Sequence, residues 1–86
     1  MMKRNRKAEQ ELMNSVIREI VVAMEERGLD GATLAKKVGC SKQRIGEILL
    51  KKNRGLNMRT VATIFAAMDL RVGIFPVGSI EGKVRR

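Results

Sequence analysis

The chain has 86 residues, about the length of one small domain. Its 18 Lys and Arg residues against 9 Asp and Glu residues give a net charge of +9, which favours a polyanionic partner: DNA, RNA or an anionic membrane surface. A single Cys excludes an intrachain disulfide scaffold, and no apolar run approaches the roughly 18 residues of a transmembrane helix. With two Phe and no Trp or Tyr, the chain lacks the rings on which single-stranded nucleic acids stack, so duplex DNA fits better.

The basic charge is concentrated in the middle of the chain. Residues 9–35 carry six carboxylates and two Arg, whereas residues 36–59 carry eight basic side chains and one carboxylate, Glu47. The basic start of the chain is followed by acidic residues and not by the apolar core of a signal peptide, so we expect a cytoplasmic protein.

The first half of the chain predicts two helices. Residues 9–27 are expected to form an amphipathic helix that ends at Gly28. Asp30 is the expected N-cap of a second helix over residues 31–38, which Gly39 ends. The apolar residues of these helices recur at spacings of three and four. They are Leu12, Met13, Val16, Ile17, Ile20, Val21 and Met24 in the first, and Leu34, Ala35 and Val38 in the second.

Two more helices are predicted after them. Ser41 caps a third helix over residues 42–51, and Asn57 caps a fourth over residues 58–68, with a basic loop between them. The residues expected to face inward are Ile45, Ile48 and Leu49 in the third helix, and Met58, Val61, Ile64, Phe65 and Met68 in the fourth. Lys42, Gln43, Arg44 and Glu47 are expected to face outward.

The C-terminal part of the chain changes period. Residues 70–77 are β-prone, and Pro76 confines them to an edge strand or to the end of a strand. We therefore predict an all-α fold of four to five helices with one short C-terminal strand. Its parts are a flexible basic arm (1–8), a helix-turn-helix domain (9–70), a dimerising strand (71–77) and a flexible basic tail (78–86). Both tails are either simply solvated or additional DNA-binding arms.

Two short helices joined by a glycine-containing turn predict a helix-turn-helix motif, centred on residues 30–50. Residues 31–48, with Leu34-Ala35, Val38-Gly39-Cys40-Ser41, Ile45 and Ile48, resemble the lambda-repressor/Cro-like (XRE-type) helix-turn-helix family. The later stretch, from Leu56-Asn57-Met58 to Phe75, resembles small phage and prophage regulators and HigA-type antitoxins. The resemblance covers about residues 10–77.

This resemblance implies a role for each matching residue. The base-reading positions are Lys42, Gln43 and Glu47. The phosphate-binding positions are Arg44, Lys51, Lys52, Asn53, Arg54, Arg59 and Thr33. The chemistry agrees, because Gln pairs with adenine, Lys with guanine and Glu with cytosine N4, while clustered Lys and Arg neutralise phosphates. The chain departs from the family at Gly31, where Gln is common, so that contact is either lost or replaced, for example by a backbone N–H at the start of the helix. Gly46, inside the third helix, either lets DNA approach or is merely tolerated.

Several of these residues could have a different role. The basic stretch could be a solvated surface, and Glu47 could form an ion pair with Lys51 at i+4. Cys40 is either a half-buried apolar residue, which we favour, or a redox switch. The six Met residues are expected to fill gaps in the core and not to bind a metal.

We expect the chain to be a DNA-binding transcriptional regulator, most often a repressor, and not an enzyme. It has no His, no recognisable acid pair and no Gly-rich phosphate loop, and we expect no cofactor and no metal. Two copies are expected to pair antiparallel through Val72, Ile74, Phe75 and Val77, placing two recognition helices ~34 Å apart on an inverted repeat. The alternatives are an antitoxin that binds a toxin protein and represses its own operon and, less favoured, a structured-RNA binder.

Overall fold

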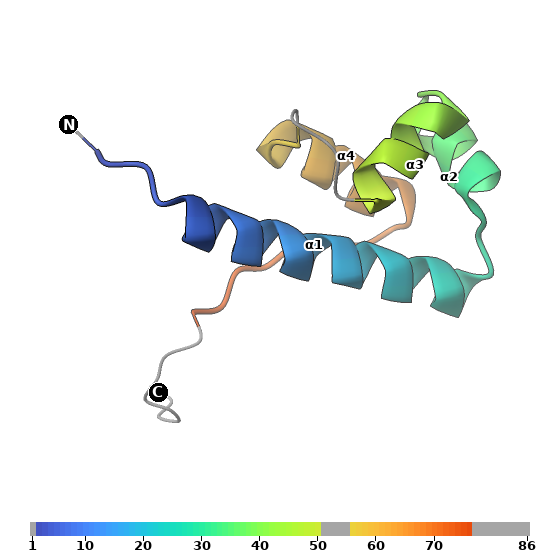
Figure 1. Ribbon diagram of the computed structural model, residues 1–86. Coiled ribbons are helices and arrows are strands. Elements are labelled where there is room, and N and C mark those ends of the chain that lie inside the picture. The colour runs from blue at the N-terminus through green and yellow to red at the C-terminus, as the bar shows by residue number, and fades with distance from the viewer. Residues whose placement is uncertain (1, 51–55, 77–86) are drawn as a thin grey trace.

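The computed structural model of the chain describes residues 2–50 and 56–76, and these residues form an all-α fold. It contains four helices: α1 (Arg6–Arg27), α2 (Gly31–Val38), α3 (Lys42–Leu49) and α4 (Met58–Ala67). The long helix α1 lies along one side, and the three short helices pack together over it (Figure 1). The predicted helical class is confirmed, with α2 at the predicted bounds. Among the described helices, none is both long enough and apolar enough to cross a membrane.

Each helix begins at a polar side chain that accepts a backbone hydrogen bond. These N-caps satisfy donors that the first turn of a helix leaves without a partner. The caps predicted at Asp30, Ser41 and Asn57 are confirmed, and Asn5 is a fourth. The accepted N–H groups belong to Ala8 at 2.9 Å from Asn5 Oδ1, Thr33 at 2.8 Å from Asp30 Oδ1, Arg44 at 3.0 Å from Ser41 Oγ and Thr60 at 2.9 Å from Asn57 Oδ1.

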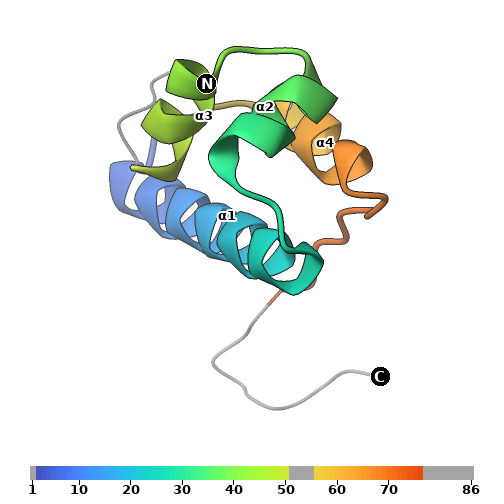
Figure 2. The same cartoon turned by 90° about the vertical axis from the view of Figure 1, so that its right-hand side faces the viewer.

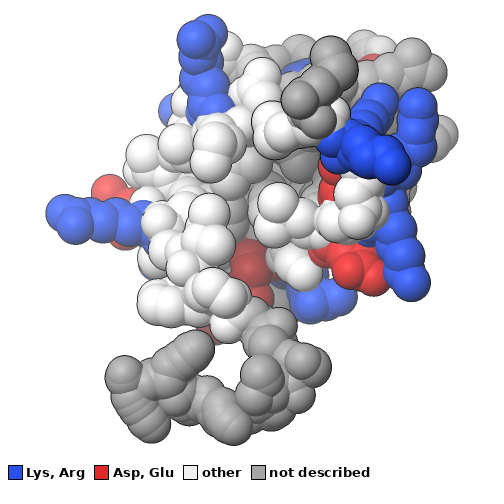
Figure 3. All heavy atoms as spheres, turned by 90° about the vertical axis from the view of Figure 1, so that its left-hand side faces the viewer, with Lys and Arg blue, Asp and Glu red and all other residues white. Residues whose placement is uncertain are grey.

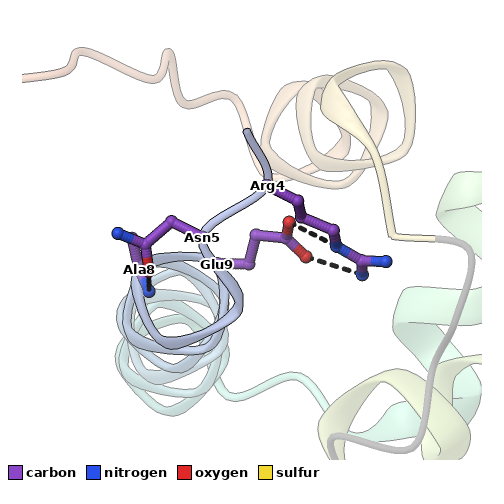
Figure 4. A network of polar contacts seen from close by, with 4 residues as sticks. All are labelled: Arg4, Asn5, Ala8 and Glu9. Carbon is purple, nitrogen blue, oxygen red and sulfur yellow. Dashed lines mark hydrogen bonds and ion pairs between the residues drawn. The ribbon is translucent and has the colours of Figure 1, made fainter. Parts of the chain in front are cut away.

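α1 begins at Arg6, earlier than residue 9, where the apolar pattern placed its start. Asn5 caps this extra turn, and the Arg4 guanidinium faces the Glu9 carboxylate in a two-bonded fork with N···O distances of 2.7 and 2.8 Å (Figure 4). The hydrogen bond from Arg4 lowers the pKa of the exposed Glu9 carboxyl. Hydrophobic periodicity does not indicate this extra turn, because the predicted apolar face of the helix begins only at Leu12.

A single core joins all four helices. Ile20, Leu34, Ile45, Ile48 and Ile64 are its fully buried large side chains. Packed around them are Ala23, Met24, Ala35, Phe65 and Met68. α2 contacts both α3 and α4, and α1 contacts the same two helices from the other side. The core therefore holds α2 and α3 in a fixed relation to each other.

Two residues predicted to face inward, Leu12 and Met58, are instead largely exposed. Leu12 is 61% exposed and Met58 is 78% exposed. α1 is 22 residues long, or ~33 Å at 1.5 Å per residue, which is longer than the helices packed on it. Its first turns extend beyond them (Figure 1). Leu12 belongs to this N-terminal half of α1, in which the first buried residue is Ile17. Met58 is the first residue of α4 and lies outside the buried length of that helix.

An Arg side chain joins the C-terminal ends of α1 and α4. Arg27 Nε donates to the Met68 carbonyl oxygen over 3.0 Å, and a cation at the end of a helix also favours its dipole. Next to it, Asp69 adopts a left-handed φ of 61°, and the Leu70 N–H donates back to the Phe65 carbonyl at 2.9 Å. The chain consequently turns from α4 toward the C-terminal end of α1 (Figure 2).

The predicted C-terminal strand does not form in the single chain. Residues 71–76 have no regular secondary structure, and Val72, Ile74 and Phe75 are 47%, 70% and 83% exposed. The fourth residue expected to pair, Val77, lies outside the described residues. A strand makes its hydrogen bonds to a neighbouring strand, and the described residues contain no other strand. The predicted strand is therefore absent from the described part of the single chain, and its pairing with a second copy stays a prediction.

Candidate nucleic-acid interface

The turn between α2 and α3 is closed by backbone hydrogen bonds. Gly39 ends α2 with a φ of 91°, and the N–H groups of Gly39 and Cys40 both donate to the Ala35 carbonyl, at 2.8 and 3.0 Å. Ser41 then caps α3 at once. With Ile45 buried below it, the turn leaves little freedom in the angle between the two helices, as a helix-turn-helix requires.

The three side chains predicted to read bases lie on the exposed side of α3. Lys42, Gln43 and Glu47 are exposed, whereas Ile45 and Ile48 on the opposite side of the helix are 1% exposed. Residues 43 and 47 are four apart and therefore neighbours on the helix surface. The structure thus places all three polar side chains of the set on one short, anchored helix.

The N-termini of α2 and α3 are close enough to interact electrostatically. Hydrogen bonds from the backbone N–H and side chain of Thr33 lower the pKa of the Asp30 carboxyl, and the charge of Lys42 contributes to the same shift. Thr33, predicted to bind phosphate, is exposed and engaged with the cap of its own helix. This side of the molecule therefore combines two helix N-termini with the predicted base-reading residues.

Glu47 has an ion-pair partner on its own helix that the sequence does not predict. Its Oε1 lies 3.8 Å from Arg44 Nη1, one turn earlier on α3, and the two side chains are 47% and 35% exposed. The predicted partner, Lys51, lies outside the described residues. The distance is too long for a hydrogen bond, so the attraction is purely Coulombic and weak at such exposure.

The phosphate-binding set is only partly described. Arg44 is half-buried on α3, and Arg59 is exposed in the first turn of α4. The structure brings these two together at a groove of about 240 Å³ between the helix-turn-helix turn and α4. The groove is lined by Val38, Gly39, Cys40, Arg44, Ile45, Ile48, Arg59, Thr60, Thr63 and Ile64. Lys51, Lys52, Asn53 and Arg54 lie outside the described residues.

Sequence reasoning missed this groove and its two Thr residues. Thr60 and Thr63 fall between the apolar positions of α4, and no sequence signal indicates which neighbouring helix they face. The half-buried Cys40, predicted to be an apolar filler, also lines the groove. Only the packing of α2 and α3 against α4 brings these residues together.

Neither unusual glycine is required by packing. A Cβ at Gly31 would meet Ile45 Cγ2 at 3.9 Å, an ordinary contact, and a Cβ at Gly46 would meet nothing within 4 Å. Gly46 is therefore not kept small by any described neighbour, although a glycine inside a helix destabilises it.

The charged side chains form separate groups on the surface. On the face shown in Figure 3, Lys and Arg side chains project at the edges and a broad uncharged area lies between them. No group of three His, Cys, Asp or Glu side chains within the described residues could hold a metal ion. Comparisons with known protein families, with curated protein sequences and with solved structures gave no significant match.

Proposed function

We propose that the chain is a sequence-specific, double-stranded DNA-binding transcriptional regulator, a repressor similar to the lambda-repressor/Cro-like family, with α3 as its recognition helix. The observation that carries this proposal is the placement of α3. Its buried side is anchored by Ile45 and Ile48, and its opposite side presents Lys42, Gln43 and Glu47 to solvent. A helix with side chains fills the B-DNA major groove, which is about 12 Å wide.

The side-chain chemistry of α3 supports base reading. The Gln43 amide can donate to adenine N7 and accept from adenine N6, and the Lys42 ammonium can donate to guanine O6 or N7. The N-termini of α2 and α3 add backbone N–H groups and positive dipole ends, which favour phosphates nearby. The overall charge of +9 favours association with DNA of any sequence.

We further propose that the regulator acts as a dimer. The support is the exposed apolar segment that contains Val72, Ile74 and Phe75, which has β-prone residues and no strand partner among the described residues. Antiparallel pairing with the same segment of a second copy would satisfy the backbone and cover these side chains. The resulting two-fold symmetry matches an inverted-repeat operator.

The same exposed segment supports a second candidate function, that of an antitoxin. An exposed apolar group of this kind is also what a protein partner would bind. In that case the segment contacts a toxin protein, and α3 still binds the operator. Sedimentation of the purified chain distinguishes the dimer role of this segment from the toxin-binding role, because the dimer proposal requires self-association without any other protein.

The test of DNA reading is selection of bound sequences from a random duplex pool at two salt concentrations. We expect the wild-type chain to select one motif. Gln43→Ala should lose discrimination at one base position, worth about 1–3 kcal/mol, while Arg59→Ala should weaken binding about equally on all sequences.

Gln10→Ala is the matched control for this selection, since Gln10 is exposed on α1 and bonds only to Asn14 in the described part of the chain. The control should keep the wild-type motif. An unchanged motif for Gln43→Ala would show that α3 is not the reading helix.

A further inference from the structure

The groove between the helix-turn-helix turn and α4 has the composition of an anion site. Arg44 from α3 and Arg59 from α4 both line it, over an aliphatic floor that includes Ile48 and Ile64. Thr60 also lines the groove, and its side chain carries a hydroxyl group. Guanidinium and hydroxyl donors from separate elements are the groups with which proteins hold phosphate.

Arg44 is at the same time the ion-pair partner of Glu47. Their 3.8 Å separation and partial exposure make this pair weak. A phosphate oxygen in the groove would offer Arg44 short, charge-assisted hydrogen bonds, which are stronger. The loss of the Glu47 pair would therefore cost little when Arg44 contacts a phosphate.

Building on the proposed function, we propose that the groove binds a backbone phosphate of DNA between Arg44 and Arg59, and that Arg44 releases Glu47 when it does so. The released carboxylate accepts a hydrogen bond from a cytosine N4 amino group. On guanine or thymine, which present no amino donor in the major groove, it stays without a partner beside the negatively charged backbone, which disfavours those bases. The Arg44–Glu47 pair thus links two contacts. The contact of Arg44 with phosphate is independent of sequence, and the contact of Glu47 with cytosine is specific for the base.

A double-mutant cycle on DNA binding tests this linkage. The affinities of wild type, Glu47→Gln, Arg44→Met and the double variant are measured on a duplex with thymine at the read position, over a series of salt concentrations. Met keeps the apolar stem of Arg44 in place. Arg59→Met, alone and with Glu47→Gln, is the matched control, since Arg59 has no ion pair within the described residues.

We expect Glu47→Gln to tighten binding about two- to fivefold more when Arg44 is present than in the Arg44→Met background, which is the effect of releasing a weak surface pair. Arg44→Met and Arg59→Met should each reduce the salt slope by about 0.9, the loss of one phosphate contact. Arg59→Met should leave the effect of Glu47→Gln unchanged.

Equal tightening by Glu47→Gln in both Arg44 backgrounds would overturn the linkage while leaving the proposed function intact. An unchanged salt slope for Arg44→Met or Arg59→Met would overturn the phosphate site in the groove. If the wild-type chain binds no duplex at all, the proposed function fails, and this inference fails with it.

Discussion

Helix α3 and the segment after α4 differ in one respect that decides what a single chain can form. Both contain residues with predicted binding roles and both contain apolar side chains. In α3 the apolar residues Ile45 and Ile48 are buried, and the backbone hydrogen bonds close within the helix. In residues 71–76 the apolar side chains are exposed and the backbone forms no strand hydrogen bonds. A strand needs a second strand both to complete its backbone hydrogen bonds and to help cover its side chains.

A helix thus forms its backbone hydrogen bonds within its own segment of the chain, whereas a strand needs a neighbouring strand to form them. The arrangement of α3 is therefore a property of the monomer. The strand proposed for residues 71–76 would require a second molecule, so its formation would depend on concentration. Substitutions in the two regions should consequently affect different measurements, folding stability for α3 and self-association for the segment.

Replacing one Ile in each region should change the free energy of unfolding by very different amounts. Ile45→Ala removes a side chain that is 1% exposed and should cost about 2–5 kcal/mol of the free energy of unfolding. Ile74→Ala, at a site 70% exposed, should cost less than about 0.5 kcal/mol in dilute solution. Urea unfolding followed by circular dichroism checks both. Comparable losses at the two sites would show that the segment packs on its own chain.

A charge in the C-terminal segment should prevent self-association. Ile74→Asp would place an unpaired carboxylate in the proposed dimer interface, and we expect association at least about tenfold weaker, equivalent to ~1.4 kcal/mol. Sedimentation equilibrium of the variant and the wild type measures this. Met58, an exposed apolar residue of α4, is the control, and Met58→Asp should leave association unchanged. A wild-type chain that remains monomeric at high concentration would contradict the dimer proposal.

Filling the helical glycine of α3 should stabilise the fold. Gly46→Ala adds a Cβ that meets nothing within 4 Å and should raise the free energy of unfolding by about 0.8–1.0 kcal/mol. Thermal unfolding measures the gain. Gly39→Ala is the control and should destabilise, because its φ of 91° is unfavourable for a residue with a Cβ. If DNA affinity falls while stability rises in Gly46→Ala, DNA approaches α3 closely at this position.

The free energy of unfolding should depend slightly on pH through the Asp30 carboxyl at the start of α2. Hydrogen bonds from Thr33 lower the pKa of the exposed Asp30 carboxyl in the folded chain. A lowered folded pKa contributes stability that is present above the unfolded pKa, near 4, and is lost as pH falls through the folded pKa. Asp30→Asn keeps a capping oxygen and should flatten the stability profile of acid unfolding below about pH 4. An identical profile for both proteins would contradict this role.

Most of the fold could be predicted because its signals are local. The N-caps Asp30, Ser41 and Asn57 and the stops Gly28 and Gly39 each act within one turn of the chain, and the helices they bound are present. α3 ends at Leu49 and α4 at Ala67, slightly before the predicted ends at residues 51 and 68. Neither of these ends is followed directly by a glycine that would mark it in the sequence.

What could not be predicted depends on contacts between distant residues or between molecules. Arg27 bonds to Met68 across 41 positions of the chain, and no spacing rule relates them. The groove brings together Arg44 and Arg59 only after α3 and α4 have packed. The ion pair between Glu47 and Arg44 depends on the side-chain geometry of α3, which periodicity does not give. The exposed side of α3 could be predicted from periodicity, whereas its binding partner is a matter for experiment.

Amide chemical-shift mapping of the labelled chain, during titration with a selected duplex, would locate the surface that DNA contacts. We predict that the largest changes occur at residues 41–47 and near the N-terminus of α2, while the exposed side of α1 around Arg18 changes little. Changes confined to residues 71–76 or to α1, with α3 unaffected, would contradict the assignment of α3 as the DNA-reading helix.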